Sequence, residues 1–293
     1  MKIIILGCGY IGSAFAHLAK SQGHQVLGVV RSEKSKQQLE STGIPSLSFD
    51  IFNSDWSVLP KDFDAVVYAA STGGGGPDAY TLAYDLGVKN AIRWAEQSKV
   101  RCFIFTSSTG VYRQDDGAPV NEESLAGGEM IADIILSGEK AVLNSKVQNN
   151  RVLRLGGLYG PGRHHLLNQL KRRELVFGGR TDHLINYLHC DDAASAILAA
   201  CLSGPAGSRI YNVTDGHPVR KDELIKWMAK KLGLPDPIFE PTAPAGPRMQ
   251  RGNRTQPSRF VDNSRALLEL DWKPTFATVQ EGMLSILEGE KRG

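Results

Sequence analysis

Short apolar runs alternate with segments of helical periodicity through the first half of this chain, and that alternation constrains its fold more than any other feature. Six runs have the length of a buried strand, and they begin at Lys2, Gln25, Ser46, Ala65, Cys102 and Val152. Segments of helical periodicity cover 13–20, 33–41, 79–98 and 137–147. Because the apolar runs are nearly continuous, we expect helices on both faces of their sheet. The pattern predicts an α/β fold built on a doubly wound parallel sheet.

The pattern becomes irregular after Leu155, where a smaller second lobe is expected to begin. Its expected elements are a basic helix over 166–173, a strand from Leu184, an amphipathic helix over 221–232, a Pro-rich connection over 235–247 and a terminal helix over 279–288. The helix over 191–202 and the strand from Ile210 can instead return to the first lobe. We predict one domain over 1–157, completed by about 188–214, and a smaller mixed α/β lobe over 158–293.

Composition excludes several classes of protein. The 34 basic and 31 acidic side chains leave a net charge of +3, too balanced for the electrostatic footprint of a nucleic-acid or membrane-binding protein. No stretch approaches the roughly 18 uninterrupted apolar residues of a membrane span. The apolar run before Gly7 is too short for a signal peptide. The cysteines are Cys8, Cys102, Cys190 and Cys201. They form no CxxC pair, so we expect no disulfide framework and no metal site. The default expectation is a soluble cytoplasmic protein.

A glycine motif of the form GxGxxG directly follows the first apolar run and directly precedes a helical segment. Gly7 permits the tight turn, Gly9 leaves the backbone open to a pyrophosphate, and Gly12 lets the helix pack closely on the strand. The N–H groups of the turn, including those of Tyr10 and Ile11, then face phosphate. The motif predicts a Rossmann-type dinucleotide-binding domain. A methyltransferase with its own nucleoside cofactor and a glycine turn without a ligand are the alternatives.

The end of the second apolar run favours NADP over NAD. A carboxylate normally binds the adenosine ribose 2′-hydroxyl at this place, but this chain has Arg31 and Ser32. A guanidinium beside a hydroxyl pairs well with a 2′-phosphate. The nearby Glu33 is the argument for NAD. Asp50, just after the third run, is expected to accept a hydrogen bond from the adenine amine, or alternatively only ends its strand.

Several segments share their order and spacing with one known family. They are GCGYIGS after the first run, VVYAAS from Val66, FTSSTGVY from Phe105, LRLGGLYGPGR from Leu153 and NYLHCDDAASAI from Asn186. Two later segments, IYNVTDGHPV from Ile210 and NSRALLELDWKP from Asn263, are similar to the family's carboxy-terminal lobe. Together they resemble the extended short-chain dehydrogenase/reductases, the NAD-dependent epimerase/dehydratase relatives of UDP-galactose epimerase. The resemblance spans nearly the whole chain.

The resemblance implies roles for residues at the ends of the fourth and fifth runs. Ala69, Ala70 and Ser71 are expected to border the adenosine side of the cofactor. Ser108 matches the family's catalytic Ser or Thr and is expected near the nicotinamide. Its hydroxyl can hydrogen-bond a substrate carbonyl or hydroxyl while hydride moves at the same carbon. A serine that only caps its strand end is the alternative.

The sequence departs from this family where the active-site Tyr and Lys belong, roughly 25 residues after the Ser, a spacing that the resemblance implies. No Tyr occurs between positions 112 and 159. If Glu139 matches the family's glutamate, Ile131 and Ile135 occupy the Tyr and Lys positions. If Lys140 is the lysine, Leu136 replaces the tyrosine. Either alignment removes the usual general acid/base, whose contribution to the rate is on the order of 10² to 10⁴.

Other candidates are weaker. Tyr112 or a water held by Ser108 can substitute for the missing acid/base. Gly74, in a loop of four glycines, can move to admit substrate. Tyr159 and Arg163 are expected at the mouth between the lobes, together with His164 and His165. Arg248 belongs to a Pro-flanked segment that can reach a substrate phosphate, and this segment also contains Arg251, Arg254 and Arg259.

Two hypotheses of different classes follow. The first is an NADP(H)-dependent oxidoreductase or epimerase/dehydratase-like enzyme with non-standard acid/base residues, acting on a nucleotide sugar or a small carbonyl or hydroxyl substrate. The second is a catalytically silent sensor or interaction protein that binds NAD(P). Both predict a small-molecule ligand, no nucleic-acid partner and a monomer or homodimer.

Overall fold

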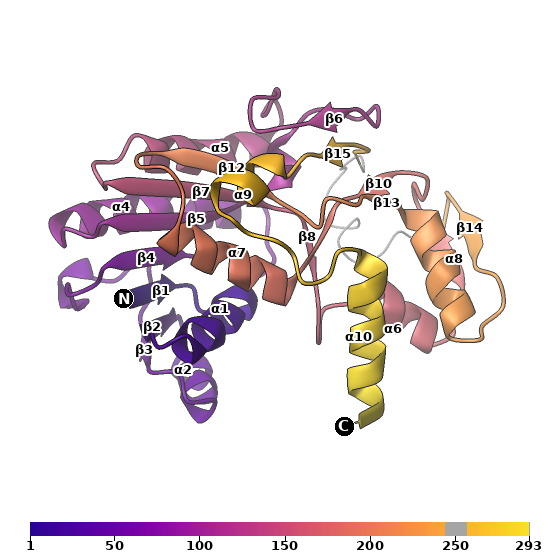
Figure 1. Ribbon diagram of the computed structural model, residues 1–293, viewed down its shortest axis with the longest axis horizontal. Helices are drawn as coiled ribbons and strands as arrows, with labels where there is room; N and C mark the ends of the chain where they lie inside the picture. Colours follow the sequence, from indigo (N-terminus) through magenta and orange to yellow (C-terminus); the bar gives the residue numbers. More distant parts are fainter. Residues whose placement is uncertain (244–256, 293) are drawn as a thin grey trace.

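The computed structural model of the protein describes residues 1–243 and 257–292, and a seven-stranded parallel sheet forms its centre (Figure 1). The strand order is β12-β7-β5-β4-β1-β2-β3. The strands are β1 (Lys2–Leu6), β2 (Gln25–Val30), β3 (Ser46–Ser48), β4 (Ala65–Tyr68), β5 (Cys102–Ser108), β7 (Asn149–Leu155) and β12 (Arg209–Val213). The predicted α/β fold with a doubly wound parallel sheet is confirmed. The run from Ile210 joins this sheet as its edge strand, in register with β7.

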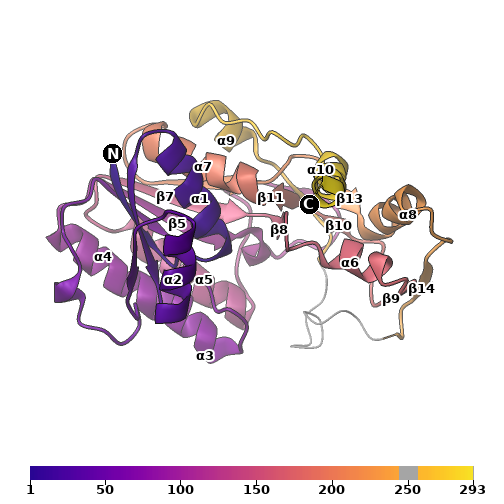
Figure 2. The ribbon, with the colours of Figure 1, turned by 90° about the horizontal axis from the view of Figure 1, so that it is seen from below.

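Helices cover both faces of the sheet, and the strands therefore bury side chains on both faces. In β1, Ile3 and Ile5 belong to the core under α1 (Tyr10–Ser21), α2 (Glu33–Ser41) and α7 (Cys190–Leu202). Ile4 and Leu6 belong to the opposite core, under α4 (Gly87–Gln97) and α5 (Met130–Leu143). All four side chains are fully buried. Figure 2 shows α1 and α7 on one side of the sheet and α4 and α5 on the other. The continuous apolar runs thus reflect burial on both faces.

Two helical segments differ from their predicted ranges. The segment 79–98 is not one α-helix, because it consists of α3 (Pro77–Tyr80), a π-helical turn (Thr81–Leu86) and α4. It packs so closely on α5 that a Cβ at Gly138 would overlap the carbonyl oxygen of Tyr84. Helix α5 begins at Met130 rather than at residue 137. The Asp133 carboxylate accepts a hydrogen bond from the Gly128 amide at 2.8 Å and so holds the start of the helix.

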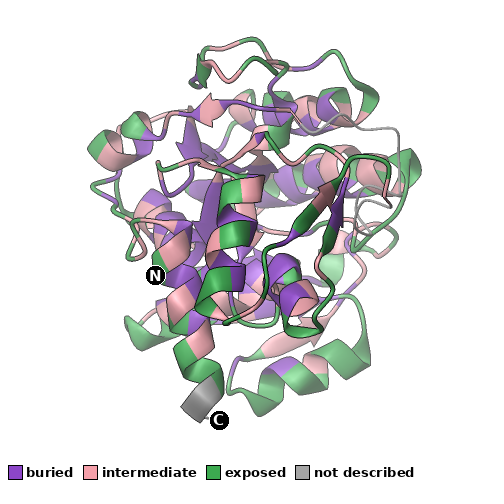
Figure 3. Ribbon diagram, turned by 90° about the vertical axis from the view of Figure 1, so that its right-hand side faces the viewer, coloured by how far each residue is buried: buried purple, intermediate pink, exposed green. Residues whose placement is uncertain are grey.

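A further hydrophobic core lies in the carboxy-terminal part, away from the sheet. It is formed by α6 (His165–Lys171), β9 (Val176–Gly178), α8 (Lys221–Lys231), β14 (Ile238–Glu240) and α10 (Val279–Arg292). Helix α8 buries one face at helical spacing, with Leu224, Ile225, Met228 and Ala229. Figure 3 shows helices of this part with buried residues on one side and exposed residues on the other. Strands β9 and β14 pair in parallel beside α8.

Short strand pairs connect the sheet to this core. They are β8 (Gly157–Tyr159) with β11 (Tyr187–His189), β10 (Leu184–Ile185) with β13 (Val219–Arg220), and β6 (Pro119–Val120) with β15 (Phe260–Val261). The run expected from Leu184 is interrupted at Asn186, because that side chain donates to the Arg259 carbonyl and accepts from the Val261 amide. Helix α9 (Ser264–Glu269) follows β15. Within the described residues no helix combines the length and apolarity that crossing a bilayer requires.

Candidate functional site

The carboxyl ends of the parallel strands meet at one edge of the sheet, where α/β proteins bind their ligands. The turn after β1 lies at this edge. Gly7 has a φ of +88°, and a Cβ there would clash with the backbone of Ala70. A Cβ at Gly12 would lie 2.8 Å from the Gly7 carbonyl oxygen. The turn and α1 are therefore packed too closely for any side chain at these two positions.

Gly9 differs from the other glycines of the motif. A Cβ added at Gly9 would meet no atom within 4 Å, so internal packing does not require a glycine there. Gly9 is also the N-cap of α1 and provides no side-chain hydrogen bond to the first turn. The amides of a first helical turn have no partner within their own helix. An open backbone with unused donors is the arrangement that a pyrophosphate needs.

The residues expected at the far end of a dinucleotide lie around one cavity of about 170 Å³. Arg31 follows β2, Asp50 follows β3 and Ser71 follows β4, and all three line it. The cavity is also lined by Phe52, Asn53, Thr72, Ala79 and Leu82, which the sequence did not single out. Asp50 organises part of this wall, because its carboxylate accepts from the Phe52 amide at 3.0 Å and from the Asn53 side chain at 3.1 Å. Phe52 and Asn53 closely follow Asp50 in the sequence, and this is the feature from which their place at the cavity could have been predicted.

The two residues after Arg31, Ser32 and Glu33, interact with nearby residues of α2. The Ser32 hydroxyl caps α2 by accepting from the Ser35 amide at 3.2 Å. The Glu33 carboxylate forms an ion pair with Lys36 at 3.0 Å. Arg31 itself is exposed at the cavity. The Glu33 carboxylate, which was the argument for NAD, therefore has the Lys36 cation beside it. The Arg31 guanidinium, in contrast, is exposed at the cavity.

Ala69 and Ala70 connect β4 to the turn. The Ala69 amide donates to the Leu6 carbonyl at 2.8 Å, and Ala70 packs against Gly7. Beyond Ser71 the chain enters the glycine loop, where Gly74 has a φ of +101° and donates to the Thr72 hydroxyl at 3.3 Å. Non-glycine residues rarely adopt this backbone conformation, so the loop has a conformational reason for its glycines.

Ser108 ends β5 at the same edge of the sheet. Its hydroxyl oxygen accepts from the Gly110 amide at 3.1 Å, which is the strand-end cap that we weighed as the alternative to catalysis. An oxygen that accepts in this way still has its O–H to donate. Arg259 stabilises the turn that follows Ser108, because its guanidinium donates to the carbonyls of Thr109 and Tyr112. Ser108 is thus fixed in place with a donor left for a ligand.

A buried polar network lies directly behind Ser108. Ser107 donates to Glu139, and the Glu139 carboxylate pairs with Arg154 at 2.6 Å. Arg154 also donates to the Tyr112 hydroxyl at 3.0 Å, and that hydroxyl donates to the Asn212 side chain at 2.7 Å. Burial is the main cause of a raised Tyr112 pKa. With 3% exposure and both partners in place, Tyr112 is positioned as a structural residue and not as a proton donor to substrate.

The orientation of α5 bears on the two alignments of the missing pair. Ile135 and Glu139 are buried and Ile131 is half-buried, so these three positions form the inward face of the helix. Lys140 is exposed. Ile131, Ile135 and Leu136 pack with Val111 in one apolar cluster. The inward positions are those named in the alignment through Glu139, and the assignment of isoleucines to the Tyr and Lys positions stays a prediction.

Several residues expected at a substrate mouth lie elsewhere. Tyr159 is 2% exposed and packs beneath α10, where Gly282 leaves room for its ring. His164 is buried against the Gly160 carbonyl. The guanidinium of Arg163 lies over the Tyr10 ring, 5.3 Å from its centre, so it is beside the glycine turn. Arg248 lies outside the described residues, as do Arg251 and Arg254. Arg259 is buried and donates to the carbonyls of Thr109 and Tyr112, so it is engaged within the fold and does not reach out toward a substrate phosphate.

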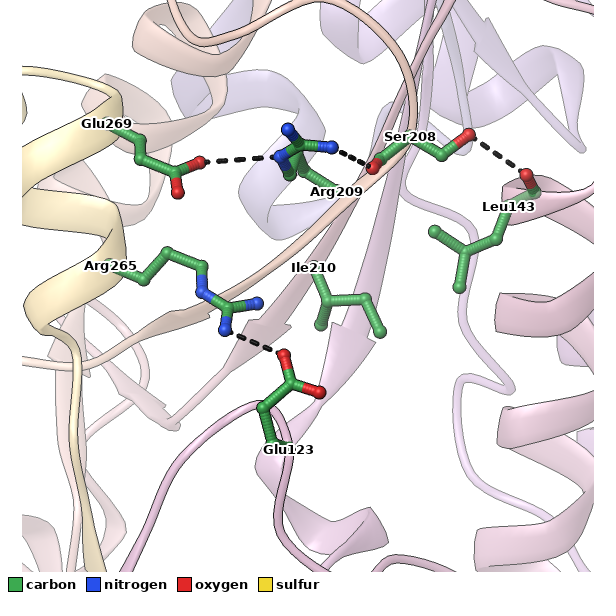
Figure 4. A pocket seen from close by; sticks show the side chains of 7 residues that line it. All are labelled: Glu123, Leu143, Ser208, Arg209, Ile210, Arg265 and Glu269. Atoms are coloured by element: carbon green, nitrogen blue, oxygen red, sulfur yellow. Dashed lines mark hydrogen bonds and ion pairs between the residues drawn. The ribbon is translucent and has the colours of Figure 1, made fainter.

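A larger cavity of about 460 Å³ lies away from this edge, between β12 and α9 (Figure 4). Its charged side chains pair with one another, as Arg265 does with Glu123 at 2.7 Å and Arg209 with Glu269 at 3.7 Å. Ser208 and Arg209 stand at the amino end of β12, which is the wrong end for the reaction site of a parallel sheet. We therefore do not place the functional site here.

One group of side chains among the described residues has the composition of a metal site. His189, Cys190 and Asp191 place possible ligand atoms within 4.8 Å of one another. However, the Nδ1 atom of His189 accepts from the Asp191 amide as the cap of α7. Burial raises the pKa of the Cys190 thiol to about 11, which disfavours the thiolate that binds metals. The absence of a metal remains a prediction.

Comparisons with known proteins agree with this architecture. The sequence profile of the NAD dependent epimerase/dehydratase family matches residues 3–214. Protein YeeZ of Escherichia coli K12 is 28% identical over 289 residues, which cover 93% of this chain and 95% of YeeZ. UDP-glucose 4-epimerase of Thermotoga maritima, solved with UDP-glucose, has a TM-score of 0.84 at 19% identity and covers 100% of this chain and 99% of its own. UDP-glucuronic acid 4-epimerase of Bacillus cereus, solved with UDP-glucuronic acid and NAD, has a TM-score of 0.82 at 22% identity, covering 100% and 99%.

Proposed function

Because the chain belongs to the NAD-dependent epimerase/dehydratase family, we propose that it binds a nicotinamide dinucleotide and acts on a nucleotide sugar or another small carbonyl or hydroxyl substrate. The observation that carries this proposal is the cavity where Arg31, Asp50 and Ser71 come together from three strands, beyond the open backbone at Gly9. The ligands of the Thermotoga and Bacillus structures, which are nucleotide sugars and NAD, support the same ligand classes.

The residues at the carboxyl edge fit such a cofactor. The first turn of α1 would hold the pyrophosphate and the cavity would hold the adenosine end, where Asp50 would accept a hydrogen bond from the adenine amine. Arg31 lines this cavity and would pair with a 2′-phosphate, whereas Glu33 is paired with Lys36. These two features support a preference for NADP over NAD. Arg163, stacked on Tyr10, adds a positive charge beside the pyrophosphate.

Ser108 is the residue that we assign to the substrate. The bound cofactor supplies a hydride acceptor or donor in this class of reaction. Ser108 donates its O–H to the oxygen on the reacting carbon and so fixes the orientation of that carbon. The buried pair of Glu139 and Arg154, together with Arg259, holds the turn that carries Ser108. The acid/base residue is non-standard, since α5 presents isoleucines at the inward positions.

Those isoleucines also support the second candidate function. A protein that keeps the cofactor cavity but presents Ile131 and Ile135 to the site can be a sensor that binds NAD(P) without turnover. The two functions differ in one measurement, because only the enzyme oxidises NADPH or converts substrate.

The test incubates purified protein with NADPH and a panel of nucleotide sugars and small carbonyl compounds. We expect substrate-dependent turnover that Ser108→Ala lowers by about tenfold to a hundredfold, the loss of one charge-stabilising hydrogen bond. Ser203→Ala, an exposed serine at the end of α7, is the matched control and retains full turnover. Nucleotide binding without turnover across the panel would instead establish the sensor.

The cofactor preference has its own test. Fluorescence titration with NADPH and NADH should show tighter NADPH binding in the wild type. Arg31→Ala should lose about tenfold to a hundredfold in NADPH affinity, equivalent to about 1.5–3 kcal/mol for a charge-assisted contact, with NADH unaffected. Arg93→Ala, an exposed arginine on α4, should change neither affinity. Equal affinities for the two nucleotides in the wild type would remove the preference.

A further inference from the structure

The reaction class needs a group that transfers a proton at the substrate oxygen. On the inward face of α5, the Glu139 carboxylate is paired with Arg154, and the two positions before it on that face are isoleucines. We propose that Tyr80, from the neighbouring helix α3, supplies the phenol that α5 lacks. This inference rests on the proposed function, since it names the proton donor of the same site. Three independent features of the structure lead to Tyr80: the environments of the other tyrosines, the packing of α3 and the position of the adjoining cavity.

The other tyrosines are excluded by their surroundings, and all eight of the chain lie in the described part. Five are buried, namely Tyr68, Tyr112, Tyr159, Tyr187 and Tyr211. Tyr10 belongs to the glycine turn, where its hydroxyl donates to the Pro161 carbonyl at 3.2 Å. Tyr80 and Tyr84 are half-buried and pack against the cluster that follows β5, so they are the two candidates that this comparison leaves.

Topology places Tyr80 at the reaction edge. β4 and β5 are adjacent and parallel, so the chain leaving β4 toward α3 and the end of β5 at Ser108 emerge side by side. Tyr80 packs against the apolar cluster that contains Val111 and Ile135, together with Ile131. Figure 2 shows α3 next to α5. The ring of Tyr80 therefore borders the two isoleucines that occupy the expected Tyr and Lys positions.

The rest of the segment shows which way α3 is turned. Ala79 and Leu82 line the cavity with Arg31 and Asp50, so one side of this segment faces the proposed adenosine pocket. Tyr80 packs on the α5 side of the same segment. A residue so placed lies between the nucleotide cavity and the Ser108 turn, where the reacting end of a dinucleotide extends from the adenosine end.

Tyr84 holds Tyr80 in position. The two rings stack at 5.5 Å with an interplanar angle of 19°. The Tyr84 ring also meets Phe105 of β5 edge to face, at 6.2 Å. The π-helical turn is in backbone contact with α5, since Gly138 leaves room only for the Tyr84 carbonyl. π-Helical turns are rare in proteins overall, and those that do occur are often found at functional sites. Tyr84 is thereby a positioning residue, and Tyr80 is the residue that we assign to the proton transfer.

The chemistry is a single proton transfer. In the reductive direction a bound nicotinamide cofactor would supply hydride to the carbonyl carbon of the substrate, and the π electron pair of the C=O bond would move to oxygen. That oxygen takes the proton of the Tyr80 O–H, so the substrate leaves as the alcohol and the phenolate regains a proton from water. Ser108 holds the same oxygen by its hydrogen bond. In the oxidative direction each transfer is reversed.

The test compares Tyr80→Phe with Tyr211→Phe, each of which removes one phenolic hydroxyl and keeps the ring. Tyr211 belongs to β12, where its hydroxyl donates to Glu269 beside the cavity away from the reaction edge. We expect Tyr80→Phe to lower turnover by about a hundredfold or more, the ordinary effect of losing a general acid, while NADPH affinity stays within about twofold. Tyr211→Phe retains turnover within about threefold. Returning a phenol to α5, as Ile131→Tyr with Ile135→Lys in the Tyr80→Phe background, restores part of the lost turnover.

A second readout does not depend on turnover. Tetranitromethane nitrates accessible phenols, and mass spectrometry of peptides locates the nitrated residue. We expect nitration of Tyr80 in the free protein and protection when NADPH and a nucleotide sugar are both present. Full turnover of Tyr80→Phe, or equal nitration of Tyr80 with and without ligands, overturns the inference. If the wild type still binds the nucleotide in that case, the proposed function is unaffected. A wild type that binds no nucleotide overturns both.

Discussion

Single residues of the glycine turn have separate tasks, although they belong to one motif. Gly7 is required by its own fold, because its positive φ and the adjacent Ala70 backbone exclude a side chain. Gly9 is required by nothing inside the protein, since a Cβ there meets open space. A glycine that the fold does not need and the proposed ligand does need is the strongest local sign of a binding site.

We predict that alanine at these two positions produces opposite defects. Gly7→Ala should lower the stability by about 3 kcal/mol, or the melting temperature by roughly 6–12 °C, because backbone strain and a clash add. Gly9→Ala should leave the melting temperature within about 2 °C and weaken NADPH binding at least about tenfold, since its methyl group stands where the pyrophosphate approaches. Calorimetry and fluorescence titration measure the two effects. A destabilised Gly9→Ala protein with intact binding would contradict the assignment.

At the scale of elements, one buried ion pair joins α5 to the sheet. Glu139 of α5 and Arg154 of β7 are both almost fully buried, and their contact extends to Ser107 of β5 and to Tyr112. Although burial alone lowers the pKa of Arg154, its bonds to Glu139 raise that pKa overall. The pair fixes the relative position of two strands and the helix that border Ser108. Removing one partner leaves a buried charge without compensation.

We predict that Glu139→Gln lowers the free energy of unfolding by about 3–5 kcal/mol, the usual cost of breaking a buried pair from one side. Glu174→Gln breaks the exposed pair with Arg172 and should change stability by less than about 1 kcal/mol. Urea denaturation of the two variants checks this difference. Equal losses would mean that the network does not hold α5 against the sheet.

At the scale of the whole molecule, a buried carboxyl group lies between the sheet and the carboxy-terminal core. Asp215 follows β12, accepts from the His217 amide at 3.0 Å and is 4% exposed. Burial raises its pKa from 3.8 to about 7, and the nearby Asp192 carboxylate contributes in the same direction. The folded protein therefore keeps a proton on Asp215 at pH values where the unfolded chain has already lost it.

The direction of the pH effect follows from proton binding. Between about pH 4 and 7 the folded state binds more protons at Asp215 than the unfolded state, so this group's contribution to stability falls as pH rises and is constant above 7. The Asp215→Asn variant has no ionisable group at this position, so it does not show this fall in stability as pH rises. Its stability relative to the wild type should rise by up to about 1.4 kcal/mol per pH unit across that window. Urea titrations of both proteins at pH 5, 6, 7 and 8 test it, and parallel curves would contradict it.

The sequence by itself determined the parallel sheet, its helices on both faces and the position of the glycine turn. These features depend on hydrophobic periodicity and on glycines within single βα units, where neighbours in sequence are neighbours in space. It also named Arg31 and Asp50, because each follows a strand and strand ends share one edge, whereas Ser71 was named through the resemblance to a known family.

Only the tertiary structure decided which side chains of distant segments meet. Burial of Tyr159 depends on Gly282, the role of Arg259 depends on the carbonyls of Thr109 and Tyr112, and the placement of Tyr80 depends on how closely α3 and the π-helical turn pack on α5. The division into lobes near residue 157 and the preference for NADP stay predictions. Contacts between distant segments follow from side-chain packing in three dimensions, and no periodicity along one chain encodes them.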